Sequence, residues 1–121
     1  MRTIDIEAAM AHAITMMVKF SRISGFDKDE KYWKKLSEIR IQRTRNMFVD
    51  GRFRDFDAKT GKPIILGDYY SVMMLAPLSF NIATIDQKNK SYDTFDYFKR
   101  NYRFWLEWPS FLFPFTEAAW N

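Results

Sequence analysis

Hydrophobic residues follow two different helical patterns in the first half of the chain. The segment from Thr3 to Ser24 has the interior AAMAHAITMMV, and a helix that is apolar around its whole circumference is normally buried on every side. Thr3 is a suitable N-cap, and Gly25 readily adopts the left-handed conformation that ends a helix. From about Asp29 to Phe48, apolar residues recur among many charged ones. This second pattern predicts an amphipathic helix at the surface.

The second half of the chain repeats this alternation. The segment from Tyr69 to Phe80, YYSVMMLAPLSF, holds no charged residue and predicts another buried helix, kinked or tightened in its last turn by Pro77. A further helix begins after Thr84, because Gln87 follows three residues later and completes a capping box. Its apolar positions recur at spacings of three and four, which predicts an amphipathic, peripheral helix. These positions are Tyr92, Phe95, Phe98 and Tyr102.

Two long connections separate the predicted helices. The helical period is lost between residues 50 and 68, and residues 51–66 alternate like two short strands around a turn at 58–62, which predicts a β-hairpin. Residues 101–115 predict an irregular, aromatic loop, after which Thr116 caps the start of a fifth helix. Successive connections of antiparallel helices lie at opposite ends of a bundle. We therefore expect both long loops at one end, and a functional site there.

Composition restricts the chemistry of the chain. A length of 121 residues accommodates one domain, which we assign to residues 1–121. The absence of cysteine and the single histidine exclude disulfides, thiolate metal sites and multi-histidine metal sites, so we expect neither a metal nor a cofactor. The net charge is +4. The basic residues of segment 28–45 alternate with acids, which is typical of a solvated helix face.

The beginning of the chain carries no recognisable targeting signal. Arg2 is followed at once by Asp5 and Glu7, whereas a signal peptide continues with an apolar run. The uncharged stretch from Ala8 to Val18 is about half the length that crosses a bilayer. The sequence predicts a soluble protein that is not inserted in a membrane, and its compartment is not determined.

The order of buried and surface helices matches the concentric helices of an α/α toroid built from six helical hairpins. The most specific segments are NMFVDGRFRDFDAKTG and PLSFNIATIDQ, and WPSFLFPFTEAAWN follows as an aromatic stretch. With these segments the chain resembles a repeat stretch of six-hairpin glycosidases of the trehalase and family 63 glucosidase kind. The resemblance covers essentially the whole chain. It implies an all-α fold of antiparallel helical hairpins forming an incomplete α/α toroid, with one β-hairpin insertion at about 51–66.

The resemblance also implies an activity, the hydrolysis of a glycosidic bond with inversion. In that reaction one carboxylic acid protonates the leaving oxygen and one carboxylate activates water from the opposite face. In relatives the acid lies before the matching stretch and the base lies after it, so the catalytic residues of this chain are unknown. We expect a fragment of an inverting glycoside hydrolase that binds carbohydrate and is inactive alone. A second copy of the chain or the remainder of the toroid would complete it.

A sugar site combines carboxylates that accept hydrogen bonds from hydroxyls with aromatic faces that stack on the ring. The candidate substrate-binding residues on the long-loop end are Asp55, Trp108, Glu117 and Trp120. Three of them also have structural interpretations. Asp55 can pair with Arg52 or Arg54. Glu117 can interact with a helix dipole, and Trp108 can cover the core.

An alternative function is a helical protein-interaction module that uses an exposed apolar face. A stable stoichiometric partner in place of carbohydrate binding would distinguish it from the glycosidase fragment. The segment YFKRNYRFW combines stacking rings with basic residues, as in proteins that bind single-stranded nucleic acid. The neighbouring acids argue against this third function, and we expect no nucleic-acid partner.

Overall fold

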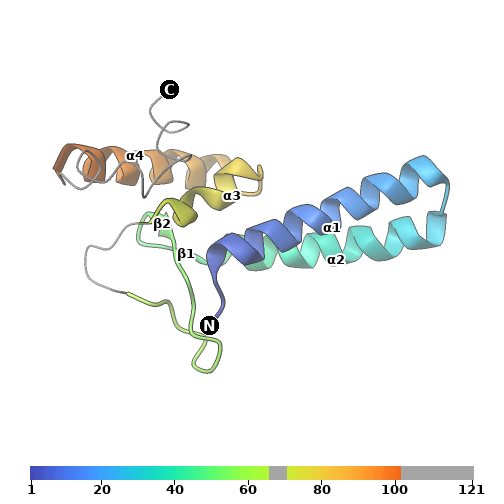
Figure 1. Cartoon of the computed structure of the whole chain (residues 1–121), viewed down its shortest axis with the longest axis horizontal. Coiled ribbons are helices and arrows are strands. Elements are labelled where there is room, and N and C mark those ends of the chain that lie inside the picture. Colours follow the sequence, from blue (N-terminus) through green and yellow to red (C-terminus); the bar gives the residue numbers. More distant parts are fainter. Residues whose placement is uncertain (66–70, 102–121) are drawn as a thin grey trace.

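The structure, a computed structural model, describes residues 1–65 and 71–101 (Figure 1). Its helices are α1 (Ile4–Ser24), α2 (Asp27–Arg45), the 3₁₀ helix η1 (Val72–Leu75), α3 (Ala76–Ser79) and α4 (Ile85–Asn101). Two short antiparallel strands, β1 (Phe48–Val49) and β2 (Arg52–Phe53), form a small sheet. The described chain is mostly helical with one small β-hairpin, which confirms the coarse fold class.

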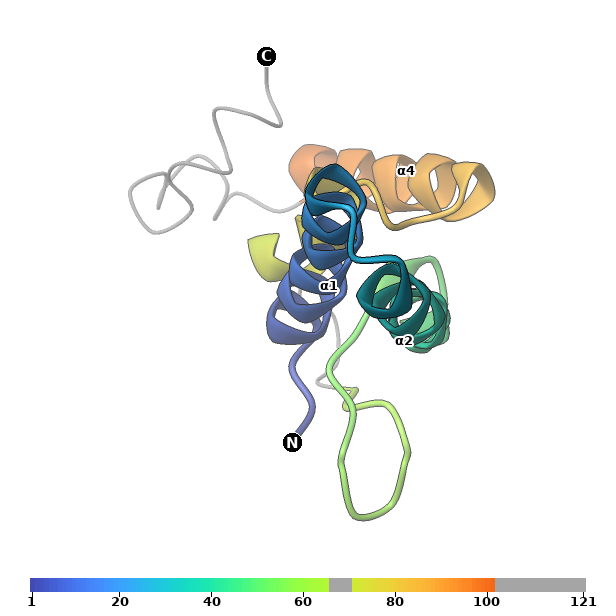
Figure 2. The same cartoon turned by 90° about the vertical axis from the view of Figure 1, so that its right-hand side faces the viewer.

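Helices α1 and α2 pack side by side as an antiparallel hairpin that extends away from α3, α4 and the sheet (Figures 1 and 2). The turn between them is closed by two backbone hydrogen bonds: the Gly25 amide donates to the Arg22 carbonyl at 3.2 Å, and the Phe26 amide donates to the Ser21 carbonyl at 3.0 Å. Gly25 has φ of 75°. This is the Schellman arrangement, in which a left-handed residue satisfies the last carbonyls of a helix. The predicted boundaries of α1 are confirmed.

Helix α1 is not buried on every side, so that prediction is wrong. One face packs against α2 and α3; its buried residues are Ile4, Glu7, Ala8, Ala11, Ile14 and Ser21. Ala8 and Ala11 form a small core cluster with Ala76 and Ile82. The opposite side of the helix carries large apolar side chains that are exposed. The described elements are too few to surround a helix that is apolar all round.

Helix α2 is a surface helix, as predicted, but it ends at Arg45 rather than near Phe48. The amide of Met47 donates to the carbonyl of Thr44 in a tight turn, and Phe48 already belongs to β1. Met47 is 2% exposed and packs with Ile4 and Phe53 in a second core cluster. Burial of Met47 in this cluster therefore accompanies the change from helix to strand.

The two-stranded sheet lies at 48–53, earlier than the predicted hairpin at 51–66. Asp50 and Gly51 both have positive φ, at 52° and 80°, as the central pair of a type I′ hairpin turn requires. The predicted turn at 58–62 also exists: the Asp57 amide donates to the Lys62 carbonyl at 2.9 Å, and Gly61 has φ of 69°. Around this second turn the pairing is reduced to isolated bridges. The Asp-Gly dipeptide decides the position of the sheet.

The predicted helix at 69–80 is shorter in the structure. Residues 66–70 lie outside the described part, and from Val72 the chain forms η1 and then the single α-helical turn α3. Pro77 has no amide hydrogen and restricts the residue before it, so it interrupts the α-helical hydrogen bonds here. Met74, Leu75, Ala76 and Pro77 are buried, but Met73 is 42% exposed. Burial of this segment is therefore confirmed only in part.

The predicted start of α4 is confirmed. The Thr84 amide donates to Gln87 Oε1 at 3.2 Å, and the Gln87 amide donates to Thr84 Oγ1 at 3.1 Å. This reciprocal pair is a capping box. Phe95 and Phe98 are buried, and Tyr92 is half exposed, as expected for an amphipathic helix. Tyr102 lies outside the described residues.

The short connection at 80–84 lies at the same end of the α1–α2 hairpin as the long connection at 50–68. Successive connections were expected at opposite ends, so this prediction is wrong. Arg45 Nε donates to the Ile82 carbonyl at 2.9 Å, and Gln87 Nε2 donates to the Arg45 carbonyl at 2.9 Å. Together η1 and α3 span residues 72–79, or about 12 to 16 Å at helical rises. That length is too short to reach the Gly25 end of α1.

Candidate functional site

Asp55 is the one predicted sugar-binding residue that lies in the described part of the chain. Its side chain is half-buried, and Oδ1 accepts a hydrogen bond of 2.8 Å from the backbone amide of Ile4. Ile4 is the first residue of α1, and the side chain of its N-cap residue, Thr3, makes no capping hydrogen bond. Asp55 therefore satisfies an otherwise unpaired amide at the positive end of the helix dipole. This role differs from the pairing with Arg52 or Arg54 that the sequence suggested, and contact of Asp55 with a sugar stays a prediction.

We expect Asp55→Ala to lower the free energy of unfolding by about 1 kcal/mol, because a helix loses its capping acceptor. Asp55→Asn retains a side-chain oxygen and should lose less. Urea unfolding monitored by circular dichroism measures both changes. If the alanine variant is as stable as the parent chain, the hydrogen bond to Ile4 contributes nothing to stability.

Two arginines beside Asp55 anchor the small sheet. Arg52 and Arg54 are 8% and 4% exposed. The Arg52 guanidinium lies 5.1 Å from the centre of the Phe98 ring, and Arg54 Nε donates to the Val49 carbonyl at 3.1 Å. Burial, and secondarily the nearby charge of Arg52, lowers the pKa of Arg54. The side chains of Arg52 and Arg54 thus contribute to the packing around β2, which the alternating sequence did not reveal.

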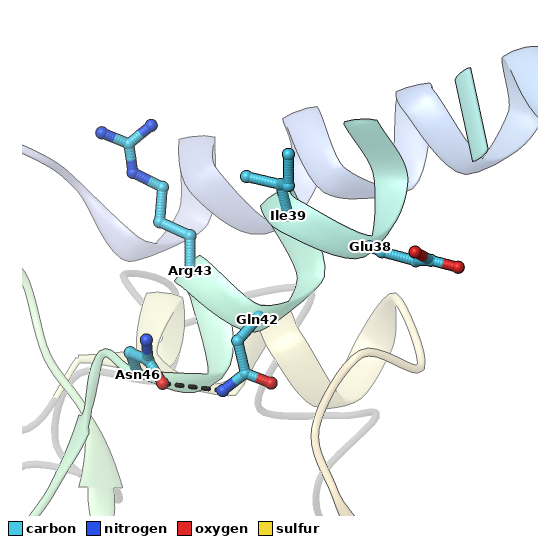
Figure 3. A pocket seen from close by; sticks show the side chains of 5 residues that line it. All are labelled: Glu38, Ile39, Gln42, Arg43 and Asn46. Carbon is cyan, nitrogen blue, oxygen red and sulfur yellow. Dashed lines mark hydrogen bonds between the residues drawn. The ribbon is translucent and has the colours of Figure 1, made fainter. Parts of the chain in front are cut away.

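A shallow depression of about 530 Å³ lies on one side of α2 (Figure 3). Its described lining consists of Glu38, Ile39, Gln42, Arg43 and Asn46. Gln42 Nε2 donates to Asn46 Oδ1 at 2.8 Å. In Figure 3 the side chains of Glu38 and Arg43 point in different directions and do not converge on one place. The depression contains none of the predicted site residues, and its geometry selects no ligand.

The other three candidates, Trp108, Glu117 and Trp120, lie outside the described residues, as do residues 102–115 of the predicted loop and the fifth helix. Within residues 1–65 and 71–101, no three histidine, aspartate or glutamate side chains gather as metal ligands would. None of the described helices combines the length and the apolar character needed to cross a bilayer.

A row of exposed apolar side chains lies along α1. We call it the outer face of α1; its residues are Ile6, Met10, Ala13, Met17, Phe20 and Ile23. The large side chains among them are 39 to 82% exposed. The outer face contains no charged residue, and contiguous apolar surface of this kind typically marks an interaction site.

Comparisons with protein-family models, with curated proteins and with solved structures found no match for the chain.

Proposed function

We propose that the protein is an incomplete carbohydrate-binding unit of the six-hairpin glycosidase type, without glycosidase activity of its own. The observation that supports this best is the outer face of α1. In a toroid of concentric helices an inner helix is surrounded by neighbours, and α1 is apolar all round but is covered by the described residues on one side only. Its surface partner α2 fits the outer layer of such an arrangement, and the segment at 72–80 is apolar like an inner helix although it is too short to run along α1. The described part corresponds to less than the complete ring.

The lack of activity follows from the chemistry of inversion. The reaction needs two carboxyl groups about 6.5 to 9.5 Å apart with space for a water molecule between them. Two half-buried or buried acids of the described part already have other contacts. Asp55 caps α1, and Glu7 lies 3.7 Å from Arg40 Nη1, with 11% of its side chain exposed. Neither is available as an open general acid or base.

We expect the purified chain to show no turnover of trehalose or of a chromogenic α-glucoside above the rate in buffer, because the acid and the base of the enzymes that it resembles both lie outside the matching stretch, and positioned proton transfer is then lost. Release of glucose, measured over a range of enzyme concentrations, checks this. Turnover that scales with protein concentration and survives repeated purification would overturn the claim.

Carbohydrate binding needs a second experiment. The chain is grafted into a complete homologous toroid, and Asp55, Trp108, Glu117 and Trp120 are changed singly to alanine. Loss of a charged or stacked contact should cost on the order of 1 to 3 kcal/mol in kcat/KM. The Asp55→Asn variant keeps the oxygen that caps α1 but removes the charge, so a loss of kcat/KM in this variant reports a charged contact with the sugar rather than helix capping. If all four variants keep full kcat/KM while folded, these residues do not form the sugar site.

The second candidate function is a helical protein-interaction module, and the uncharged outer face of α1 specifically favours it. A chain of this kind binds a protein at fixed stoichiometry and shows no affinity for carbohydrate. Calorimetric titration with oligosaccharides tests carbohydrate binding, and native mass measurement tests for a complex of fixed stoichiometry. A complex without carbohydrate binding would favour the interaction module.

A further inference from the structure

We infer that the outer face of α1 binds the same face of a second copy, with the two α1 helices antiparallel. This inference uses the same face of α1 as the proposed function but does not require carbohydrate binding. Ile6, Met10, Ala13, Met17 and Phe20 follow one another at alternating spacings of four and three. Such spacing keeps one apolar seam facing a neighbouring helix over several turns. The buried positions of α1 lie on its other side against α2 and α3, so no described element covers the seam, and it can meet another chain.

The size of the outer face suits a weak homodimer. Its large side chains within the seam, Ile6, Met10, Met17 and Phe20, expose 39 to 61% of their surface, which corresponds to on the order of 400 Å² per chain at about 200 Å² for each full side chain. Two copies then bury on the order of 800 Å² in total, in the range of weak, transient interfaces. We therefore expect a dissociation constant in the micromolar range.

Charge selects the antiparallel orientation. Asp5 and Lys19 lie along one edge of the outer face, near its two ends, with His12 between them at seven-residue intervals. Antiparallel helices place this edge beside the same edge of the second copy, so that Asp5 meets Lys19 in two symmetric pairs. A parallel arrangement would place it beside the row of Glu7, Ile14 and Ser21. These are buried within their own chain and offer no such pairing.

The antiparallel arrangement also places a small side chain at the centre. Ala13 is midway between Ile6 and Phe20 and is exposed. A small residue at the crossing point lets two helices approach closely. Met10 and Met17 then pack on either side of the two-fold axis, and Phe20 of one copy lies near Ile6 of the other.

Sedimentation velocity of the full chain across the micromolar range tests the association. We expect the parent chain to change from monomer to dimer, and Met17→Lys to raise the dissociation constant about tenfold or more by placing an unpaired charge in the seam. Ile85→Lys is the matched control, because Ile85 is 80% exposed but lies on α4; it should dimerise like the parent. A parent chain that stays monomeric throughout, or equal effects of the two variants, would overturn the inference.

Cross-linking tests the orientation, and the absence of native cysteine makes each single-cysteine variant unambiguous. Ala13→Cys lies at the axis and should form a disulfide-linked dimer under mild oxidation. Ile6→Cys should not, since the two copies of position 6 lie roughly 20 Å apart along the helices, and a disulfide needs Cα atoms within about 7 Å. A mixture of Asp5→Lys and Lys19→Asp chains should form heterodimers, because each variant supplies the charge that the other lacks. Efficient cross-linking at position 6 would show a parallel dimer and disprove the antiparallel arrangement.

Discussion

Phe53→Ala is expected to lower the free energy of unfolding by about 3 to 5 kcal/mol, the usual cost of removing a buried aromatic side chain. Phe53 is 0% exposed and lies in a core cluster with Ile4 and Met47. Its ring meets that of Phe48 edge to face, with centroids 4.9 Å apart. One side chain thus joins the first turn of α1, the turn after α2 and the sheet. Truncation leaves a cavity among three elements that cannot all move inward.

Urea denaturation followed by fluorescence and circular dichroism measures this loss. Phe26→Ala is the matched control, because the Phe26 side chain is 62% exposed and should change stability by less than about 1 kcal/mol. Since a typical domain has only about 5 to 15 kcal/mol of stability, the Phe53 variant should be partly unfolded at physiological temperature. Equal losses for both phenylalanines would show that the cluster around Phe53 is not a core.

Gly51→Ala is expected to cost about 2 to 4 kcal/mol, for two separate reasons. Gly51 has φ of 80°, where a side chain adds strain of about 1 to 2 kcal/mol. In addition, a Cβ built there would lie 2.8 Å from Thr94 Oγ1. That hydroxyl donates to the Gly51 carbonyl at 2.7 Å, so the close approach is the contact that holds the sheet turn against α4. The substitution therefore weakens the attachment of the sheet to α4.

Gly25→Ala separates the two causes. Gly25 has a similar φ of 75°, but nothing lies within 4 Å of a Cβ built there. Its loss of stability measures the backbone strain alone, and the excess loss at Gly51 measures the clash with Thr94. Thr94→Ala in the Gly51→Ala background should recover part of that excess, which a double-mutant cycle quantifies. If Gly51→Ala and Gly25→Ala lower the free energy of unfolding equally, the packing of the turn against α4 contributes nothing to stability.

The sequence alone determined those features that depend on groups a few residues apart. The left-handed glycine after Ser24, the capping box of Thr84 and Gln87, and the charged surface of α2 were all predicted correctly. In each case the hydrogen-bond partners, or the period of the pattern, lie within one or two helical turns. A helix end or an amphipathic face is therefore encoded where it occurs.

Only the tertiary structure decided which helix faces are buried by neighbouring elements and which carboxylates already have hydrogen-bond partners within the chain. Asp55 caps α1 from 51 residues away, Arg52 lies over Phe98, and one face of α1 remains exposed although its composition suited complete burial. These outcomes depend on which segments meet in space, and no local pattern contains that information. The candidate sugar site shows the same limit: carboxylates and rings can be recognised by type, but their use depends on contacts between distant segments. The apolar composition of a helix indicates that it can be buried. The number of neighbouring elements that pack against the helix decides how much of its surface is buried.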